Sequence, residues 1–337
     1  MPRATEDRFL GAMLGLAIGD ALGMPFRGMS REEIAAAVGP VRAFHPLVDP
    51  IDGDVEAGEV TEETESALVI AEAMTTTGGV LDPDLAGPRL AHLARGESRR
   101  WFTPDAVANI LRGEVEFDYQ LPLHEDAPLP PEILVRGVPI GLIHSLGALD
   151  REDLLADAEA AVRLSHASTA AISGVAMTAA MTRAAATDET PPNEWAAAAA
   201  TVLGGDMAER VAATVGRYET VELHHALDAA LASDPETGPL AAAVLGAIRA
   251  ERFEDAVFAA VEAGGATDTL GALTGALAGA RFGSSGIPQP LIDALGCRIY
   301  VSLAAPWLLK AARRRAGTVI DLLPRFDVPR PDMPPRV

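Results

Sequence analysis

The sequence is nearly devoid of cysteine: its 337 residues include a single one, Cys297. One thiol cannot form an internal disulfide bond, and the N-terminus does not show the basic, apolar and small-residue pattern of a secretory signal. These two absences predict a protein of the reducing cytoplasm.

Positive charge is also scarce. Lysine and arginine number 27 against 48 aspartates and glutamates, which gives a formal net charge of -21. DNA, RNA and anionic lipid surfaces attract proteins through basic patches. The composition therefore predicts a protein with no nucleic acid partner.

Long apolar runs are missing as well. Trp195–Leu203 and Ala241–Ile248 are among the longest, and they reach about half of the roughly 20 residues that a membrane-spanning helix needs. No membrane partner is expected. The composition leaves the oligomeric state open.

Alternating strand patterns are absent, whereas apolar residues recur at helical spacing between short clusters of glycine, proline and aspartate. No stretch has the composition of a flexible linker, so the sequence predicts one all-α, multi-helix globule over residues 1–323. Ser30-Arg31-Glu32-Glu33 has the pattern of a capping box that opens a short helix. Other helices are expected over Thr5–Ala21 and near residues 62–77, 83–95, 104–113, 151–164, 166–186, 193–203, 206–214, 222–231, 237–250, 254–262, 268–282, 288–296 and 298–314.

Two segments are rich in proline. Pro122–Pro139 is expected to be an extended surface loop, because proline disfavours the helical conformation of the residue before it. Residues 324–337 are expected to form a proline-rich C-terminal arm.

Glycines recur every four residues in two of the expected helices. One ladder contains Gly11, Gly15, Gly19 and Gly23, and the other contains Gly271, Gly275 and Gly279. Glycine within a helix costs about 0.8–1.0 kcal/mol relative to alanine, so seven of them need a structural reason. Close backbone contact supplies one, and both helices are predicted to pack tightly in the centre of the fold, against each other or against a neighbour.

Two further segments place acidic and hydroxyl side chains at the start of a helix. They are Gly58–Thr64, which precedes the apolar run from Ala67, and Gly264–Thr269, which precedes the second glycine ladder. Free backbone N–H groups and the helix dipole also gather at such ends. Each segment alone is typical of ordinary helix capping, and together they could hold a hard cation or a phosphate.

These segments belong to a wider pattern that resembles the ADP-ribosylglycohydrolase family. The resemblance rests on Arg8–Gly23, Gly58–Thr64, Arg136–Leu142, Ser165–Ser168 and Ala263–Gly283, which follow one another in family order. It implies an all-α fold of the ADP-ribosylglycohydrolase type. It also implies a central cleft in which two magnesium ions bind the ribose of an ADP-ribosyl group and position a water for glycosidic cleavage.

The chain departs from the family pattern at several positions. Thr61-Glu62-Glu63 stands where the family usually has Thr-Asp-Asp, Ala266 replaces a metal-binding aspartate, and Arg27 replaces a glutamate. The Asn-Gly element before Arg136 is replaced by residues 132–135. The changes at Ala266 and Arg27 make the site less negative, whereas two magnesium ions need an oxygen-rich, negative cage.

The resemblance and its departures together predict at most one magnesium ion, with Arg27 as a fixed cation for a phosphate or a hydroxyl. His166 is a candidate acid, base or ring contact, with helix capping or packing as the alternative. The candidate site comprises the catalytic residues Glu62, Glu63 and Asp268, the substrate-binding residues Asp20, Arg27, His166, Gly264, Gly265 and Thr267, and the metal ligands Thr61, Glu62, Glu63, Asp268 and Thr269.

Three functions remain open from the sequence. The first is hydrolysis of an N- or O-glycosidic bond to ribose in an ADP-ribosylated protein, a nucleotide or a nucleoside-like small molecule, with Glu62 or Glu63 orienting the water. The second is a catalytically silent homologue that binds ADP-ribose or a nucleotide. The third is an enzyme of specialised metabolism that uses the same cleft for a nucleotide-derived substrate.

Overall fold

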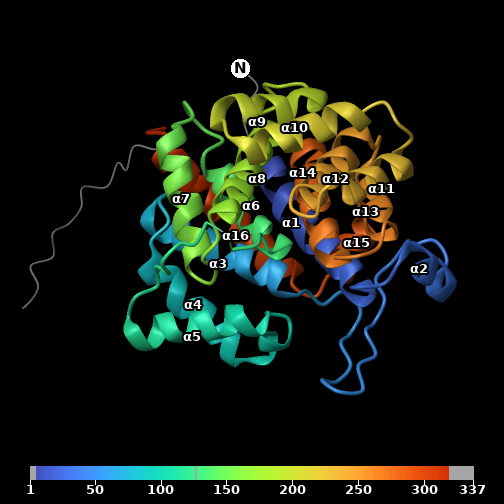
Figure 1. Ribbon diagram of the computed structural model, residues 1–337, viewed down its shortest axis with the longest axis horizontal. Coiled ribbons are helices and arrows are strands. Elements are labelled where there is room, and N and C mark those ends of the chain that lie inside the picture. Colours follow the sequence, from blue (N-terminus) through green and yellow to red (C-terminus); the bar gives the residue numbers. More distant parts are fainter. Residues whose placement is uncertain (1–4, 126, 319–337) are drawn as a thin grey trace, which may run out of the picture.

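The computed structural model describes residues 5–125 and 127–318, and these ranges form an all-α fold (Figure 1). In this part of the chain the only β-type pairings are three isolated bridges. The helices are α1 (Glu6–Gly23), α2 (Arg31–Val38), α3 (Glu62–Thr77), α4 (Pro83–Arg95), α5 (Pro104–Glu116), α6 (Gly137–Ile143), α7 (Arg151–Arg163), α8 (Thr169–Thr187), α9 (Trp195–Leu203), α10 (Asp206–Tyr218), α11 (Leu223–Ser233), α12 (Gly238–Arg249), α13 (Phe253–Glu262), α14 (Thr267–Phe282), α15 (Gln289–Ala294) and α16 (Arg298–Arg315).

The prediction of an all-α fold is confirmed, and most helices begin and end within a few residues of the expected positions. The capping box before α2 is confirmed in detail. The Ser30 hydroxyl accepts from the Glu33 backbone N–H at 3.3 Å, and the Glu33 carboxylate accepts from the Ser30 N–H at 2.8 Å. This reciprocal pair satisfies two N–H groups that a helix start would otherwise leave free.

The expectation that Pro122–Pro139 is extended throughout is wrong. A 3-10 helix over Pro131–Arg136 leads directly into α6. Pro131 is the first residue of the 3-10 helix and Pro139 lies in the first turn of α6, where a missing N–H costs no intrahelical hydrogen bond. The C-terminal arm expected over residues 324–337 lies outside the described residues.

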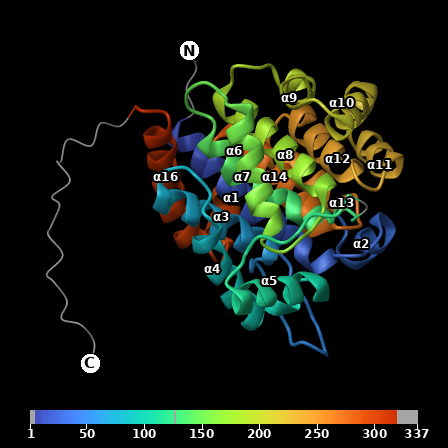
Figure 2. The same ribbon diagram turned by 60° about the vertical axis from the view of Figure 1, so that its left-hand side comes forward.

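The two glycine ladders pack against each other. This is the first of the two arrangements that the sequence predicted. A Cβ added at Gly15 would lie 2.1 Å from the backbone oxygen of Gly275, and one added at Gly19 would lie 1.9 Å from that of Gly271. No side chain fits between helices at that distance. Helices α1 and α14 therefore run through the centre of the molecule in direct backbone contact (Figures 1 and 2).

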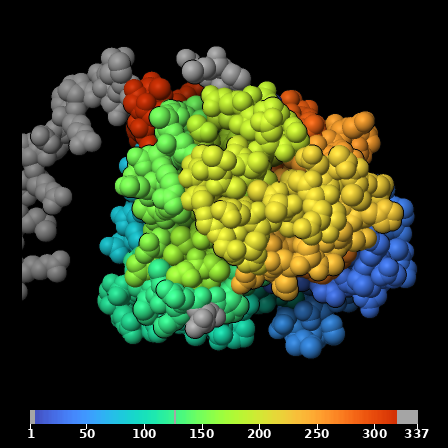
Figure 3. All heavy atoms as spheres, turned by 45° about the horizontal axis from the view of Figure 1, so that its top comes forward, coloured from blue at the N-terminus to red at the C-terminus, as the bar shows by residue number. Residues whose placement is uncertain are grey.

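Other helices bury this central pair. Helix α12 packs against α14, and Figure 3 shows the yellow and orange segments, which include α10 and α12, at the surface of one face of the molecule. The stretch Glu6–Phe26, which contains α1, is long and apolar enough to cross a membrane, a property that the run-length argument from the sequence overlooked, and it is 89% buried within the protein. Its burial against α14 explains the apolar composition of α1 as that of a core helix.

Candidate functional site

The last turn of α1 lies beside the first turn of α3. Asp20, completely buried near the end of α1, accepts hydrogen bonds at Oδ2 from the backbone N–H groups of Thr61 (2.9 Å) and Thr64 (3.2 Å) and from the Thr64 hydroxyl (2.6 Å). Its Oδ1 lies 2.8 Å from the Thr61 hydroxyl. Asp20 therefore anchors the start of α3, and its predicted role in substrate binding stays a prediction.

Glu63 links the start of α3 to the start of α14. Its Oε1 accepts from the Thr269 hydroxyl at 2.5 Å, and its Oε2 lies 2.6 Å from the Thr61 hydroxyl. Thr61 is thus within bonding distance of two carboxyl groups but has only one hydroxyl proton to donate. One of the two carboxyls, Asp20 or Glu63, must supply the second proton.

Burial explains where that proton comes from. Loss of water around the carboxyl raises the pKa of Asp20 and of Asp268 to about 7. Burial also raises the pKa of Glu62, with Glu63 adding to the rise, and raises that of Glu63, with Asp20 adding to it. Four carboxyl groups therefore share one buried cluster, in which burial favours the protonated form of each, whereas the charge of Arg27 favours the ionised forms of Glu62, Glu63 and Asp268.

Arg27 lies over this cluster. Its Nη2 is 3.3 Å from Oε1 of Glu62, and its Nε is 3.1 Å from Oδ2 of Asp268. Burial works against the charged guanidinium, but the charges of Asp268 and Glu62 raise the pKa of Arg27. The Arg27 side chain is 35% exposed whereas those of Glu62 and Asp268 are 5% and 0% exposed. Arg27 therefore lies between the buried carboxylate cluster and the solvent.

The glycines before α14 hold Arg27 in place. Gly265 exchanges two backbone hydrogen bonds of 2.8 Å with the segment after Arg27, one from the Gly28 N–H and one to the Met29 oxygen. Gly264 and Gly265 have φ angles of +83° and +80°, and a Cβ at Gly264 would lie 2.7 Å from the Met29 oxygen. These glycines therefore have a positioning role, and their predicted contact with substrate stays a prediction.

Side chains of the protein itself contact all four carboxyl groups of the cluster. Glu62 and Asp268 face the same guanidinium, and Glu63 and Asp20 bind threonine hydroxyls. Within residues 5–125 and 127–318 no three His, Cys, Asp or Glu side chains converge as metal ligands. Arg27 thus lies between two of the carboxylates, Glu62 and Asp268. The expectation of at most one ion stays a prediction.

A narrow pocket extends from Glu62 to His166. Its volume of about 10 Å³ is near the minimum for one water molecule, and Glu132 and Arg136 also line it. The buried Arg136 donates from Nη1 to the Ala161 oxygen at 2.7 Å, while its Nε has no hydrogen-bond partner. Burial and the Arg136 charge lower the pKa of His166 to about 3. His166 is therefore neutral at pH 7, with one ring nitrogen that can accept a hydrogen bond and one that can donate.

Most of the predicted site residues lie close together. The segments Gly58–Thr64 and Gly264–Thr269, about 200 residues apart in the sequence, are joined by the hydrogen bond between Glu63 and Thr269. Thr267 is the exception, because its hydroxyl donates to the Gly23 oxygen at 2.7 Å and so ties α14 to α1. Sequence reasoning gave no role to Arg136 and Glu132. Arg136 stands in one of the segments that carry the family resemblance, which was the available signal.

A model of the ADP-ribosylglycohydrolase family matches residues 1–319. The chain belongs to this family. A solved structure titled ADP-ribosylglycohydrolase-related protein complex superposes with a TM-score of 0.67 at 27% identity and covers 91% of this chain and 98% of its own. The all-α fold is therefore the fold of this family over nearly the whole chain.

Curated relatives of this ADP-ribosylglycohydrolase family member extend over different shares of the chain. An uncharacterized protein of Archaeoglobus fulgidus is 29% identical over 92% of this chain and 98% of its own length, and the uncharacterized Escherichia coli protein YegU is 27% identical over 85% and 90%. The ADP-ribosyl-[dinitrogen reductase] glycohydrolase of Rhodospirillum rubrum is 35% identical over 22% of this chain and 24% of its own length.

The buried carboxyl groups of this family member predict an unusual dependence of stability on pH. A carboxyl whose pKa rises on folding stabilises the fold fully below its unfolded pKa of about 4, and this contribution is lost as the pH rises through the folded value. For Asp20 that window runs from about 4 to about 7. Its ionisation therefore weakens the fold at pH 8.

An Asp20→Asn variant tests this expectation. Its amide can donate to the Thr61 hydroxyl, whose own proton then goes to Glu63. We expect the melting temperature of Asp20→Asn to exceed that of the parent at pH 8 by roughly 2–5 °C and to match it near pH 5. A parent that gains stability from pH 6 to 8 relative to Asp20→Asn would contradict the shifted pKa.

Proposed function

We propose that this chain hydrolyses a glycosidic bond between C1 of a ribose and an N or O atom of an ADP-ribosyl, nucleotide or nucleoside-like substrate. The observation that carries the proposal is the meeting of Thr61, Glu62, Glu63, Asp268 and Thr269 at one place, beside a pocket. Acid–base hydrolysis needs carboxyl groups in more than one protonation state within reach of one bond.

The proposed chemistry uses Glu62 and Asp268 on either side of Arg27. Oε2 of Glu62 is buried, has no hydrogen-bond partner, and belongs to a side chain that lines the pocket. In its ionised form Glu62 orients a water there and takes one of its protons as the oxygen attacks C1 of the ribose. Asp268 in its protonated form gives a proton to the leaving N or O atom and regains one from Glu62, so that one water is consumed and one hemiacetal and one free acceptor are formed.

Arg27 supplies the fixed positive charge in this proposal. A guanidinium can donate to two ribose hydroxyls or to a phosphate through its planar fork. Because it already spans Glu62 and Asp268, no step of the proposed reaction is routed through a metal ion. Magnesium, in this proposal, numbers one ion at most and is not required.

The test measures release of ADP-ribose from ADP-ribosyl-arginine and ADP-ribosyl-serine, and of free base from nucleosides, with and without EDTA. Hydrolysis that persists in EDTA and falls by about 100–10,000-fold in Glu62→Gln would support the proposal. Glu65→Gln is the matched control, because Glu65 lies on the same helix α3 but accepts from the Ser98 hydroxyl at 2.8 Å, whereas Arg27 pairs with Glu62 and Asp268. Equal losses in the two variants would contradict it.

One observation favours the silent homologue as a second candidate. The ion pairs of Arg27 with Glu62 and Asp268 engage both of the carboxylates that the hydrolysis would use. Under this alternative, calorimetry shows ADP-ribose binding that Arg27→Gln weakens, while none of the substrates is hydrolysed.

A further inference from the structure

Helix α16 carries an apolar face that is largely exposed in the described part of the chain, with the Lys310 ammonium 4.8 Å from the centre of the Trp307 ring. Ile299, Tyr300, Leu303 and Trp307 are 67%, 50%, 63% and 57% exposed. They recur at three- and four-residue spacing, so they form one stripe along the outer side of the helix. The opposite side, with Val301, Leu308 and Leu309, is buried in the core.

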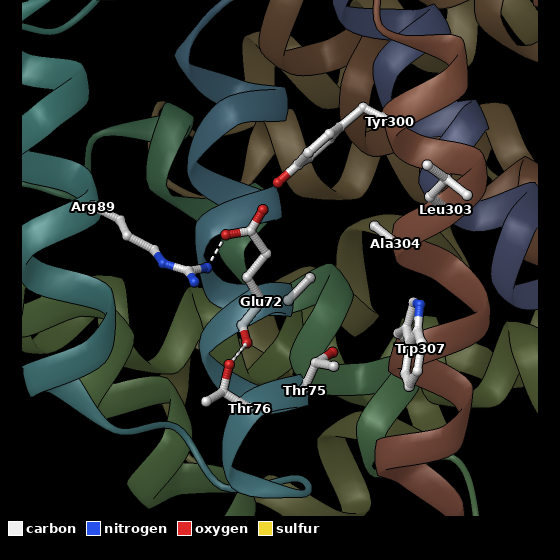
Figure 4. Close-up of a pocket in the computed structure, with 9 residues that line it drawn as sticks. Glu72, Thr75, Thr76, Arg89, Tyr300, Leu303, Ala304 and Trp307 are labelled. Carbon is white, nitrogen blue, oxygen red and sulfur yellow. Dashed lines mark hydrogen bonds and ion pairs between the residues drawn. The ribbon is translucent and has the colours of Figure 1, made fainter.

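A groove lies directly beside this stripe. Its volume is about 260 Å³, and its floor and walls come from α3, α4 and α16 (Figure 4). Tyr300, Leu303 and Trp307 form one wall, and the ion pair of Arg89 with Glu72 closes the other. An apolar ridge and a groove thus lie side by side on one surface, so that a two-fold axis could seat each ridge in the opposing groove.

We propose that this face binds a second copy of the chain, with the two α16 helices antiparallel about an axis beside Leu303 and Ala304. In this register Tyr300 of one copy lies against Trp307 of the other, and the two-fold axis generates the same contact a second time. Leu303 faces the small Ala304 across the axis, which allows close approach. The stripe is therefore complementary to itself, as a two-fold interface requires.

The charge of α16 selects the antiparallel orientation. The helix contains Arg298, Lys310, Arg313, Arg314 and Arg315 and no acidic residue, in a chain of net charge -21. Antiparallel packing places the two arginine clusters about 30 Å apart at 1.5 Å per residue, roughly four Debye lengths at physiological salt. Parallel packing would bring these clusters together, whereas the antiparallel register brings only Arg298 of one copy close to Lys310 of the other.

The exposed apolar area of the stripe is close to the apolar share of a standard dimer interface. Four large side chains that are half to two-thirds exposed offer roughly 400–500 Å² of apolar surface per copy. A standard interface buries about 800 Å² on each partner, with polar groups at its rim. Glu72, Thr75, Thr76 and Arg89 surround the stripe and supply such a rim.

The test is the mass of the full chain in solution by light scattering or sedimentation. We expect the parent at about 100 µM, above micromolar dissociation constants, to have twice the monomer mass of 35.1 kDa. Leu303→Glu and Trp307→Glu should each give a monomer. Ile51→Glu is the control, because Ile51 is 89% exposed on a loop remote in sequence from α16, and it should remain a dimer.

Cross-linking keeps the proposal testable if a charged variant fails to fold. Leu303→Cys lies near the axis, so oxidation should join two chains, whereas Ile51→Cys should not cross-link. A monomeric parent at this concentration would overturn the proposal. A dimer that survives both charged variants would overturn it as well, as would a monomer that binds acidic lipid vesicles through Trp307.

Discussion

Replacing Gly15 with leucine is expected to lower the free energy of unfolding by more than about 3 kcal/mol, beyond the usual range for overpacked cores. Even the first added carbon would lie 2.1 Å from the Gly275 oxygen and 3.1 Å from the Phe253 ring. Backbone cannot move aside as a flexible side chain can, so α1 and α14 would have to separate. Gly275→Leu should have the same effect, since its Cβ would lie 2.0 Å from the Gly15 oxygen.

A matched pair of alanine variants isolates the contact from helix propensity. Gly15→Ala should destabilise the protein, whereas Gly216→Ala should stabilise it by about 0.5–1 kcal/mol. Gly216 also lies within a helix, α10, but a Cβ there meets nothing within 4 Å. Chemical denaturation of the three proteins gives both values. If Gly15→Ala were as stable as Gly216→Ala, the close contact of α1 and α14 would be refuted.

The second large effect is expected from reversing the charge over the carboxylate cluster. The double variant Arg27→Glu with Ala266→Asp removes the guanidinium between Glu62 and Asp268 and adds two carboxylates. Hard-cation sites need such oxygen ligands. We expect the double variant to bind magnesium in calorimetry and to gain about 2.7 kcal/mol of stability at a hundredfold excess over its dissociation constant. The parent should gain little or none.

The same measurements show what Arg27 does for a ligand. If it contacts an anion, Arg27→Glu alone should abolish binding of ADP-ribose, because the contact becomes a repulsion. Arg217→Glu, a charge reversal on the exposed side of α10, should change neither magnesium nor ADP-ribose binding. A parent that already binds two magnesium ions, lost in Glu63→Gln and Asp268→Asn, would show that Arg27 moves out of the site.

Local patterns in the sequence predicted most of the fold. Caps and periodic apolar positions are set within a few residues of each other, which is why α3 and α4 begin and end where expected. The four-residue glycine spacing predicted tight packing of both helices and gave the contact of α1 with α14 as one of two possible arrangements, which the structure confirms. Helix α6 was missed because prolines are allowed in a first helical turn, a position that sequence alone does not reveal.

The candidate site was harder to predict than the helices. Motif positions identified which residues meet, but the geometry of Arg27 depends on backbone bonds between Met29 and Gly265, which no local pattern contains. The raised pKa values of Asp20 and Asp268 follow from complete burial, which is a property of the whole fold. The role of Arg136 likewise depends on a carbonyl 25 residues away.

The backbone contact between α1 and α14 also sets an order of events during synthesis. Helix α1 ends at Gly23, and its partner begins at Thr267. At about 5–20 residues per second, the ribosome needs roughly 10–50 s to add the residues between them. Throughout that time an apolar helix, long enough to cross a membrane, lacks the surface that buries it. The chain should therefore depend on chaperones that hold its first helix until its last quarter is made.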